Sequence, residues 1–423
     1  MLDYLIVGGG IHGTHLSLYL TQRGSVPYDR LCVLDPYEAP LARWDATIAN
    51  VGMDYLRSSH AHNLHYDPFS LATFARTRQG APLARFTDPY GRPSVELFRA
   101  HCQHLIERYN LDSLRIVGRA NGLTRMEGGW RVETDNGSLE ARRVILAISL
   151  TEQPYWPPWA QTLRAAGAPI HHIFDPQFRR EALAGWKHAV VIGGGITAAQ
   201  TALTLSAQAP VTLLMRHPTR IHAFDADPCW VTALCLRSFH DEPDYTRRRA
   251  LIQQARHRGS MPPDVARDLQ QTALAGALTR RLSEVTHACL AQPLSPPLYE
   301  VERGAGGEDD LSSLQTTSLF PSLPEGQAMR IHLHLADNST LEADLVILAT
   351  GFEAARPGGA WLDRAIAGYG LPVAPCGYPV VDKSLRWQRG LYVTGPLAEL
   401  EIGPVARNII GARLASERIA RRA

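Results

Sequence analysis

The amino terminus of the chain combines an apolar run, three glycines and a helical pattern, and this combination restricts the possible folds most strongly. The apolar run precedes Gly8, Gly10 and Gly13, the amphipathic pattern ends near Gly24, and a second apolar run, "RLCVLD", ends in Asp35. This order is typical of a strand, a glycine-rich turn, a helix and a second strand. The first glycine permits a tight turn, the second lets a pyrophosphate approach the backbone, and the third lets helix and strand pack closely. The segment predicts a Rossmann-like dinucleotide-binding domain in which Asp35 accepts hydrogen bonds from a ribose.

The same pattern recurs in the middle of the chain, within "KHAVVIGGGITAAQTALTLSAQAPVTLLMRHPTR". Its turn contains Gly193, Gly195 and Ala198, and its second apolar run ends in Arg216, where the first copy has an acid. An arginine at this position suits the 2′-phosphate of NADP(H), which a carboxylate would repel. The sequence therefore predicts a second dinucleotide-binding domain that takes NADP(H), with Arg220 as a possible second contact.

A longer repeat accompanies the two glycine-rich turns. "DNGSLEARRVILAIS", from Asp135, and "DNSTLEADLVILATG", from Asp337, share Asp-Asn, Leu-Glu-Ala and Val-Ile-Leu-Ala. Each copy predicts a hairpin that leads into a strand. We expect the first copy to close the first pass through the first domain, and the second copy to return the chain to that domain. The predicted fold class is α/β, with the second Rossmann-like domain, residues 154–328, inserted into the first, residues 1–153 and 329–423.

Length, composition and charge agree with this arrangement. A chain of 423 residues is too long for one ordinary core, and contents of 45% hydrophobic and 20% charged residues are globular values. The net charge of +2 gives no reason to expect nucleic acid or a membrane as a partner. No apolar run approaches the roughly 20 residues that span a bilayer, and no signal peptide is evident. We expect a soluble, cytoplasmic protein.

Local features of the sequence add four expectations. The six cysteines are scattered without a C-x-x-C pair, so we expect buried or incidental thiols, which disfavours a disulfide reductase. The arginines of "TRRRA", Thr246 to Ala250, are expected on a solvated helix face. The segment from Arg248 to Leu282 predicts helices broken at "GSMPP". Residues 291–328 are rich in Pro, Ser and Gly and predict a long, mobile surface loop.

Two fingerprints in this order, followed by "LATGF", resemble the two-domain flavoprotein oxidoreductases, in which FAD takes the first site and NAD(P)H the second. "DLVILATGFE" is similar to the A-T-G-Y/F motif of N-hydroxylating and flavin-containing monooxygenases, and "MDYLRSSHAHNLHYDPFSLATFAR" resembles, with gaps, the flavin-facing segment of lysine and ornithine N-hydroxylases. The architecture matches along most of the chain, but the specific matches are short. The resemblance implies FAD and NADPH as cofactors. It also implies a monooxygenase that forms a C4a-hydroperoxyflavin with molecular oxygen and N-hydroxylates a small amine or amino acid.

Two motifs depart from related families. Gly395 is followed by Pro396, where pyridine-nucleotide reductases have Gly-Asp, and this disfavours reductases. The flavin-containing monooxygenase motif F-x-G-x-x-x-H-x-x-x-F/Y is met only in part, by Gly167, His171 and a displaced Phe174. Two alternatives stay open: an NADPH-dependent flavin dehydrogenase or reductase without oxygen insertion, and a catalytically silent flavin-binding regulatory protein.

The candidate catalytic residues come from the segment after Met53. Arg57 could pair with a substrate carboxylate or a flavin phosphate, and a neutral histidine could keep an amine unprotonated, since only its lone pair can attack. We therefore predict that Arg57, His60, His62 and Asn63 are catalytic. A metal held by the histidines of "SSHAHNLHYDP" is disfavoured, because spacing alone shows neither ligand geometry nor supporting contacts.

The predicted cofactor contacts come from both fingerprints and from later segments. Trp44 could cover the flavin ring or belong to the core. The last segment begins with Gly403 and Pro404 and predicts a helix whose positive end stabilises negative charge on reduced flavin, or else a plain amphipathic helix. In chain order the predicted contacts are Gly8, Gly10, Gly13, Asp35, Trp44, Val117, Gly193, Gly195, Ala198, Arg216, Thr350, Gly351, Gly395, Gly403 and Pro404.

Overall fold

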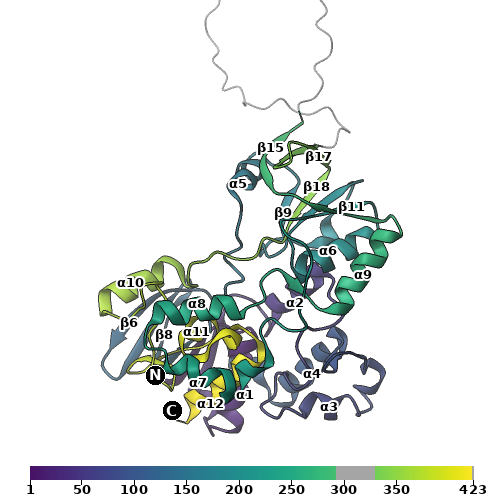
Figure 1. The fold of residues 1–423 in the computed structure, drawn as a ribbon. Helices are drawn as coiled ribbons and strands as arrows, with labels where there is room; N and C mark the ends of the chain where they lie inside the picture. Colours follow the sequence, from purple (N-terminus) through teal and green to yellow (C-terminus); the bar gives the residue numbers. More distant parts are fainter. Residues whose placement is uncertain (292–328, 422–423) are drawn as a thin grey trace, which may run out of the picture.

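The computed structural model describes residues 1–291 and 329–421, so the predicted loop at 291–328 falls almost wholly outside the described residues. The chain forms two lobes, and the lower lobe in Figure 1 contains both chain termini, while the middle of the chain builds the upper one. Each lobe is built round its own mainly parallel sheet, which confirms the predicted fold class. Within the described ranges, no helix combines the length and the apolar character that a bilayer crossing requires.

The sheet of the first domain is assembled from both ends of the chain. Six of its strands lie in the order β19-β20-β8-β1-β2-β5, and the antiparallel pair β6-β7 is attached to β8. Strand β1 pairs in parallel with both β2 and β8. The bounds are β1 Leu2–Val7, β2 Leu31–Asp35, β5 Arg115–Val117, β6 Ala120–Met126, β7 Gly129–Thr134, β8 Gly137–Leu146, β19 Arg386–Gln388 and β20 Leu391–Val393.

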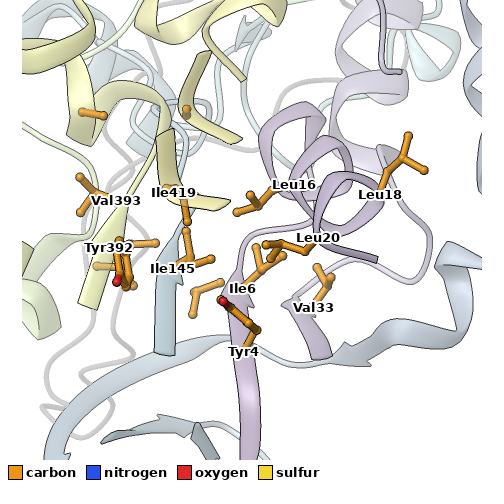
Figure 2. Close-up of a cluster of buried hydrophobic side chains, with 14 of the residues drawn as sticks. Tyr4, Ile6, Leu16, Leu18, Leu20, Val33, Ile145, Tyr392, Val393 and Ile419 are labelled. Atoms are coloured by element: carbon orange, nitrogen blue, oxygen red, sulfur yellow. The ribbon is translucent and has the colours of Figure 1, made fainter. Parts of the chain in front are cut away.

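Helices α1 (Ile11–Gln22) and α12 (Ile409–Ala420) cover one face of this sheet. Leu16 and Leu20, one turn apart on α1, lie with Ile419 of α12 over Ile6 and Ile145 of the central strands (Figure 2). All five side chains are almost completely buried, which is a large apolar contribution to stability. The packing fixes the glycine-rich turn between β1 and α1 at the carboxyl end of β1.

The sheet of the second domain is parallel throughout, in the order β14-β11-β10-β18-β9. Helices α6 (Ile196–Ser206) and α9 (Pro263–Leu274) pack on one face, and α5 (Pro158–Ala165) packs on the other with a small antiparallel sheet. Because both faces are covered, the central strands β10 and β18 are continuous apolar runs. The strand bounds are β9 Ile170–His172, β10 Ala189–Ile192, β11 Val211–Met215, β14 Leu278–Leu282, β15 Val285–Leu290, β16 Ile331–Leu335, β17 Thr340–Ala343 and β18 Leu345–Leu348.

The two copies of the repeat form hairpins that lead into β8 and β18, as predicted, but the second copy joins the other sheet. Strand β18 pairs with β10 of the second domain. The expectation that this copy returns the chain to the first domain is therefore wrong. The predicted boundary between residues 328 and 329 is misplaced, because the chain leaves the second sheet only after Leu348.

The repeat has the same structural role in both domains, because its strand packs against the glycine-rich turn. A Cβ atom at Gly8 would lie 2.5 Å from the carbonyl oxygen of Ala147, and one at Gly193 would lie 2.6 Å from that of Ala349. These alanines end the two Val-Ile-Leu-Ala runs. Each Rossmann-like domain therefore uses the same short strand beside its glycine-rich turn, which explains why the phrase occurs twice.

Part of the inserted segment lies on the first domain. Helices α7 (Ala233–Asp241) and α8 (Tyr245–Ala255) lie beside α11 (Glu399–Ile402) in Figure 1, and Arg248 of α8 donates to the carbonyl oxygen of Leu400. Arg248 and Arg249 are each 9% exposed. The predicted solvated arginine face is therefore wrong for these two residues, because α11 covers them. The helices predicted on either side of "GSMPP" are confirmed as α8 and α9.

Two further expectations need correction. Cys229 and Cys235 form a disulfide just before and within α7, so they are not free thiols. The other four cysteines are free, and Cys32 and Cys102 are buried. The last helix also begins later than predicted: residues Pro404–Arg407 form a 3₁₀ turn, and α12 starts only at Ile409.

Candidate cofactor and substrate cleft

A cavity of about 1500 Å³ is lined by both glycine-rich turns. Gly8 and Gly10 contribute to it from the first domain, and Gly193 and Gly195 from the second. Ligand pockets commonly measure about 300–1,000 Å³. The cleft therefore has room for more than one small ligand, and it brings the two predicted dinucleotide sites into one space.

The first turn has the steric features of a pyrophosphate site. Gly8 has φ +114°, and a Cβ at Gly13 would collide with the carbonyl oxygen of Gly8. Gly10 differs from both, since it has φ −73° and no atom lies within 4 Å of where its Cβ would be. Open space beside the amino terminus of α1 is the place that a bound phosphate needs.

Asp35 and Arg43 complete this side of the cleft. Asp35 lines the cavity and accepts hydrogen bonds from the N–H groups of Gly9 and Tyr37, and burial raises its pKa against their effect. Its remaining lone pairs can accept from a ribose. Arg43 is 8% exposed, and its Nε and Nη1 atoms have no hydrogen-bond partner among the described residues. These orphaned donors fit an anionic cofactor.

The other predicted cofactor contacts divide into two groups. Trp44, Thr350, Gly351 and Gly395 line the cavity. Val117, Gly403 and Pro404 are not among the described residues that line the cavity. Gly118, which follows Val117, does line it. Thr350 donates to the carbonyl oxygen of Tyr155 at 2.6 Å, so it also joins the two connections between the domains.

The second turn presents Gly193, Gly195 and Arg216 to the cavity, with Ala198 buried behind them. Arg216 directly follows β11, and 73% of its side chain is exposed. Its Nη1 atom lies 3.4 Å from the Oε1 atom of Glu284. The guanidinium is thus accessible to a phosphate, with one exposed carboxylate competing for it.

Arg57 lines the cavity, but its guanidinium is already occupied. It pairs with Asp225 at 2.7 Å and donates to the carbonyl oxygens of His222 and Phe224 and to the hydroxyl of Ser260, each at 2.8 Å. Its donors therefore hold the inserted segment against the first domain and are not free for a substrate carboxylate.

The polar groups that follow Arg57 are not brought to the cleft. His60, His62 and Asn63 are not among the described residues that line the cavity. Asn63 donates to the carbonyl oxygens of His60, Asp67 and Pro68, which is a loop-stabilising pattern. Burial, and then the charge of Arg413, lower the pKa of His62 to about 4. These three predicted catalytic residues therefore belong to a loop outside the described cavity lining.

We expect Arg57→Leu to destabilise the protein by about 2–4 kcal/mol, because it removes several hydrogen bonds and leaves Asp225 without its partner. The check is urea unfolding followed by circular dichroism. Arg85→Leu is the matched control, since the Arg85–Glu96 pair is exposed on both sides and should change stability by less than about 1 kcal/mol. Equal effects of the two substitutions would contradict the structural role.

Sequence inspection missed several residues of the cleft. His12, inside the first fingerprint, lines the cavity and lies 2.9 Å from the hydroxyl of Thr394. Burial lowers the pKa of His12 to about 4, so it is neutral near pH 7. Its place between two fingerprint glycines was the available signal. The sequence carries no such signal for Arg43 or for the cavity-lining arginines of the inserted segment, because only their burial in the folded chain distinguishes them from other arginines.

The two Rossmann-like domains, each with a glycine-rich turn, have the fold of several solved hydroxylases and monooxygenases. The chain is similar to the ornithine hydroxylase of Pseudomonas aeruginosa, with a TM-score of 0.68, 15% identity and coverage of 99% of this chain and 98% of that one. It is also similar to the FAD-bound cadaverine monooxygenase of Erwinia amylovora, with a TM-score of 0.69, 15% identity and coverage of 100% and 94%. The L-lysine 6-monooxygenase of Pseudomonas syringae gives a TM-score of 0.66, 18% identity and coverage of 100% and 98%.

Sequence similarity to a curated protein covers a smaller part of the chain. The CzcO-like oxidoreductase of Geobacillus kaustophilus is 25% identical over 132 residues, which are 31% of this chain. The match spans only 36% of that curated relative. No family model matches the chain. The similarity that covers the whole chain is therefore one of fold.

Proposed function

We propose that the protein is an FAD- and NADPH-dependent monooxygenase that N-hydroxylates a small amine or amino acid. The observation that carries the proposal is the meeting of two glycine-rich turns in one cleft, the first of which has the steric features of a pyrophosphate site. Similar folds belong to proteins that act on ornithine, lysine and cadaverine. The balanced reaction converts amine, O₂, NADPH and a proton into hydroxylamine, NADP⁺ and water.

Each cofactor has candidate contacts of its own. The open backbone at Gly10 and the free donors of Arg43 would hold the FAD pyrophosphate, and Asp35 would accept from its ribose. Arg216 would bind the 2′-phosphate of NADPH. FAD, when bound, would supply the two-electron chemistry that couples NADPH to oxygen.

The two chain segments that connect the domains are hydrogen-bonded to each other, and this fixes the position of one proposed site relative to the other. Tyr155 donates its N–H to the carbonyl oxygen of Gly351 at 3.0 Å, and Glu353 donates to that of Gln153 at 2.9 Å. These segments carry the chain into and out of the second domain. They line the cavity, so the same residues that join the domains also shape the space where cofactors and substrate would meet.

The reductase alternative differs in its product. No cysteine is among the described residues that line the cavity, so a thiol–disulfide relay has no groups there. A simple NADPH oxidase or dehydrogenase needs no such groups. Its products distinguish it from a monooxygenase in the experiment below.

We expect purified protein to be yellow and to form one hydroxylamine for each NADPH oxidised with a suitable amine. The measurement is NADPH absorbance together with hydroxylamine and hydrogen peroxide assays over a panel of amines, thioethers and ketones. Boiled protein and reactions without amine are the controls. NADPH consumption that yields only hydrogen peroxide with every amine would contradict N-hydroxylation, and a colourless protein that takes up no FAD would contradict the cofactor assignment as well.

A further inference from the structure

Four arginines line one wall of the cleft: Arg249, Arg256, Arg258 and Arg407. Arg249 belongs to α8, Arg256 and Arg258 follow its last turn, and Arg407 ends the 3₁₀ turn before α12. Gly395 and Pro396 of the first domain line the same cavity. The group therefore lies where the inserted segment meets the carboxy-terminal part of the first domain.

Two of these arginines are held rigidly by one buried carboxylate. Glu399 is 1% exposed; it accepts from Nε of Arg407 at 2.9 Å and pairs with the guanidinium of Arg249 through its other oxygen. The Arg249 guanidinium also lies 4.1 Å from the ring centroid of Tyr378. Such contacts fix the positions of both positive charges.

The other two arginines have no comparable partner. Among the ion pairs of residues 1–291 and 329–421, none includes the side chain of Arg256 or Arg258, and the neighbouring Asp225 is already bonded to Arg57 at 2.7 Å. Burial, and then the charge of Arg407, lower the pKa of Arg256 to about 9, so it stays charged at neutral pH. Four positive charges thus share one buried carboxylate, Glu399; Arg256 is half-buried and Arg258 is exposed to solvent. Like charges gathered in a partly buried wall are unfavourable unless an anion joins them.

The proposed phosphate contacts of NADPH and FAD come from other groups, although Gly259, next to Arg258, lies beside the second glycine-rich turn. The amino terminus of α6, at Gly195, offers N–H groups to the NADPH pyrophosphate, and Arg216 stands at the 2′-phosphate position. The FAD pyrophosphate has Gly10 and Arg43. The arginine wall is therefore left for a third ligand in the same cleft.

We propose that Arg249, Arg256, Arg258 and Arg407 form a subsite for a small amine substrate that carries at least two negative charges, held through carboxylates or a phosphate. The proposal rests on the monooxygenase function proposed above and names its substrate class. Planar guanidinium groups bind carboxylate and phosphate oxygens in pairs. A diamine such as cadaverine would be repelled by the same wall.

The test is isothermal titration calorimetry of the FAD-loaded protein with NADP⁺ present at saturation. The probes are L-glutamate and O-phosphoethanolamine against L-ornithine and cadaverine. We expect at least one acidic probe to bind at least about tenfold more tightly than either ornithine or cadaverine. Arg256→Gln and Arg258→Gln should each weaken that probe about tenfold or more. The Arg247→Gln variant is the matched control, because Arg247 lies on α8, like Arg249, but has 74% of its side chain exposed; it should leave probe affinity unchanged.

A thermal measurement gives a second, activity-independent result. Removing an unpaired charge from a like-charged group should leave the melting temperature of Arg256→Gln equal to or above that of the parent in a buffer without polyvalent anions. The acidic probe should raise the melting temperature of the parent and of Arg247→Gln more than that of Arg256→Gln.

The outcomes separate this subsite from the proposed reaction. Equal affinity for acidic and basic probes, or a greater loss of NADP⁺ than of probe in Arg256→Gln, would overturn the subsite even if cadaverine or ornithine were hydroxylated. Tight, Arg256-dependent binding of an acidic amine supports the subsite. If that amine then gave no hydroxylamine, the monooxygenase function would fail and the anion site would stand.

Discussion

Gly10→Val is expected to abolish FAD binding while leaving the protein folded. Gly10 has an ordinary φ of −73°, and no atom lies within 4 Å of the position that a Cβ would take. Valine therefore fits the folded chain, but its side chain would occupy the space beside the amino terminus of α1, where a pyrophosphate must approach. We expect a loss of at least about 3 kcal/mol, or about 100-fold, in FAD affinity.

The measurement is flavin fluorescence titration of apoprotein, with circular dichroism to verify folding. Gly368→Val is the matched control, because Gly368 of α10 (Gly359–Tyr369) also has nothing within 4 Å of its Cβ position. It should bind FAD like the parent. Gly13→Val gives the opposite contrast: its side chain would collide with the Gly8 carbonyl, so we expect it to damage the fold itself. Normal FAD affinity in a folded Gly10→Val protein would refute the assigned cofactor position.

Arg216→Ala is expected to weaken NADPH binding about 10- to 100-fold and to change NADH binding much less. A charge-assisted hydrogen bond to the 2′-phosphate contributes about 1.5–3 kcal/mol, and NADH has no such phosphate. The rate of anaerobic flavin reduction at increasing NADPH and NADH concentrations measures both apparent affinities.

Glu284→Gln provides the companion variant. Its carboxylate lies 3.4 Å from Arg216 and competes with the phosphate for the same guanidinium, so its removal should tighten NADPH binding modestly. Equal losses for NADPH and NADH in Arg216→Ala would show that this arginine does not recognise the 2′-phosphate.

Much of the fold was predictable because its determinants are local. A glycine is required where φ is positive, as at Gly8, or where two backbones touch, as at Gly13, and such needs appear directly in the residue type. The apolar runs on either side identify buried strands. Both Rossmann-like domains followed from these signals, whereas the insertion of the second into the first was predicted from a return of the second repeat copy to the first domain, which is wrong.

The candidate site was predictable only in part. Gly10, Asp35, Trp44 and Arg216, which were predicted to contact cofactors, line the cleft, whereas His60, His62 and Asn63 are not among the described residues that line it. The histidine segment has the polar composition of an active-site loop, but the side chains of His60 and Asn63 are hydrogen-bonded to nearby backbone atoms. Residue type indicates what a side chain can bind, and the contacts of the folded chain decide whether it is free to do so.

By itself the sequence determined that the chain contains two Rossmann-like units and which glycines form their turns, because backbone sterics act over a few residues. The tertiary structure alone decided that β18 joins the second sheet, that Arg57 is tied to Asp225, and that Arg256 faces the cleft without an acidic partner among the described residues. These outcomes depend on pairings between segments far apart in the chain. An identical local pattern is compatible with several such pairings, and only the folded packing selects one.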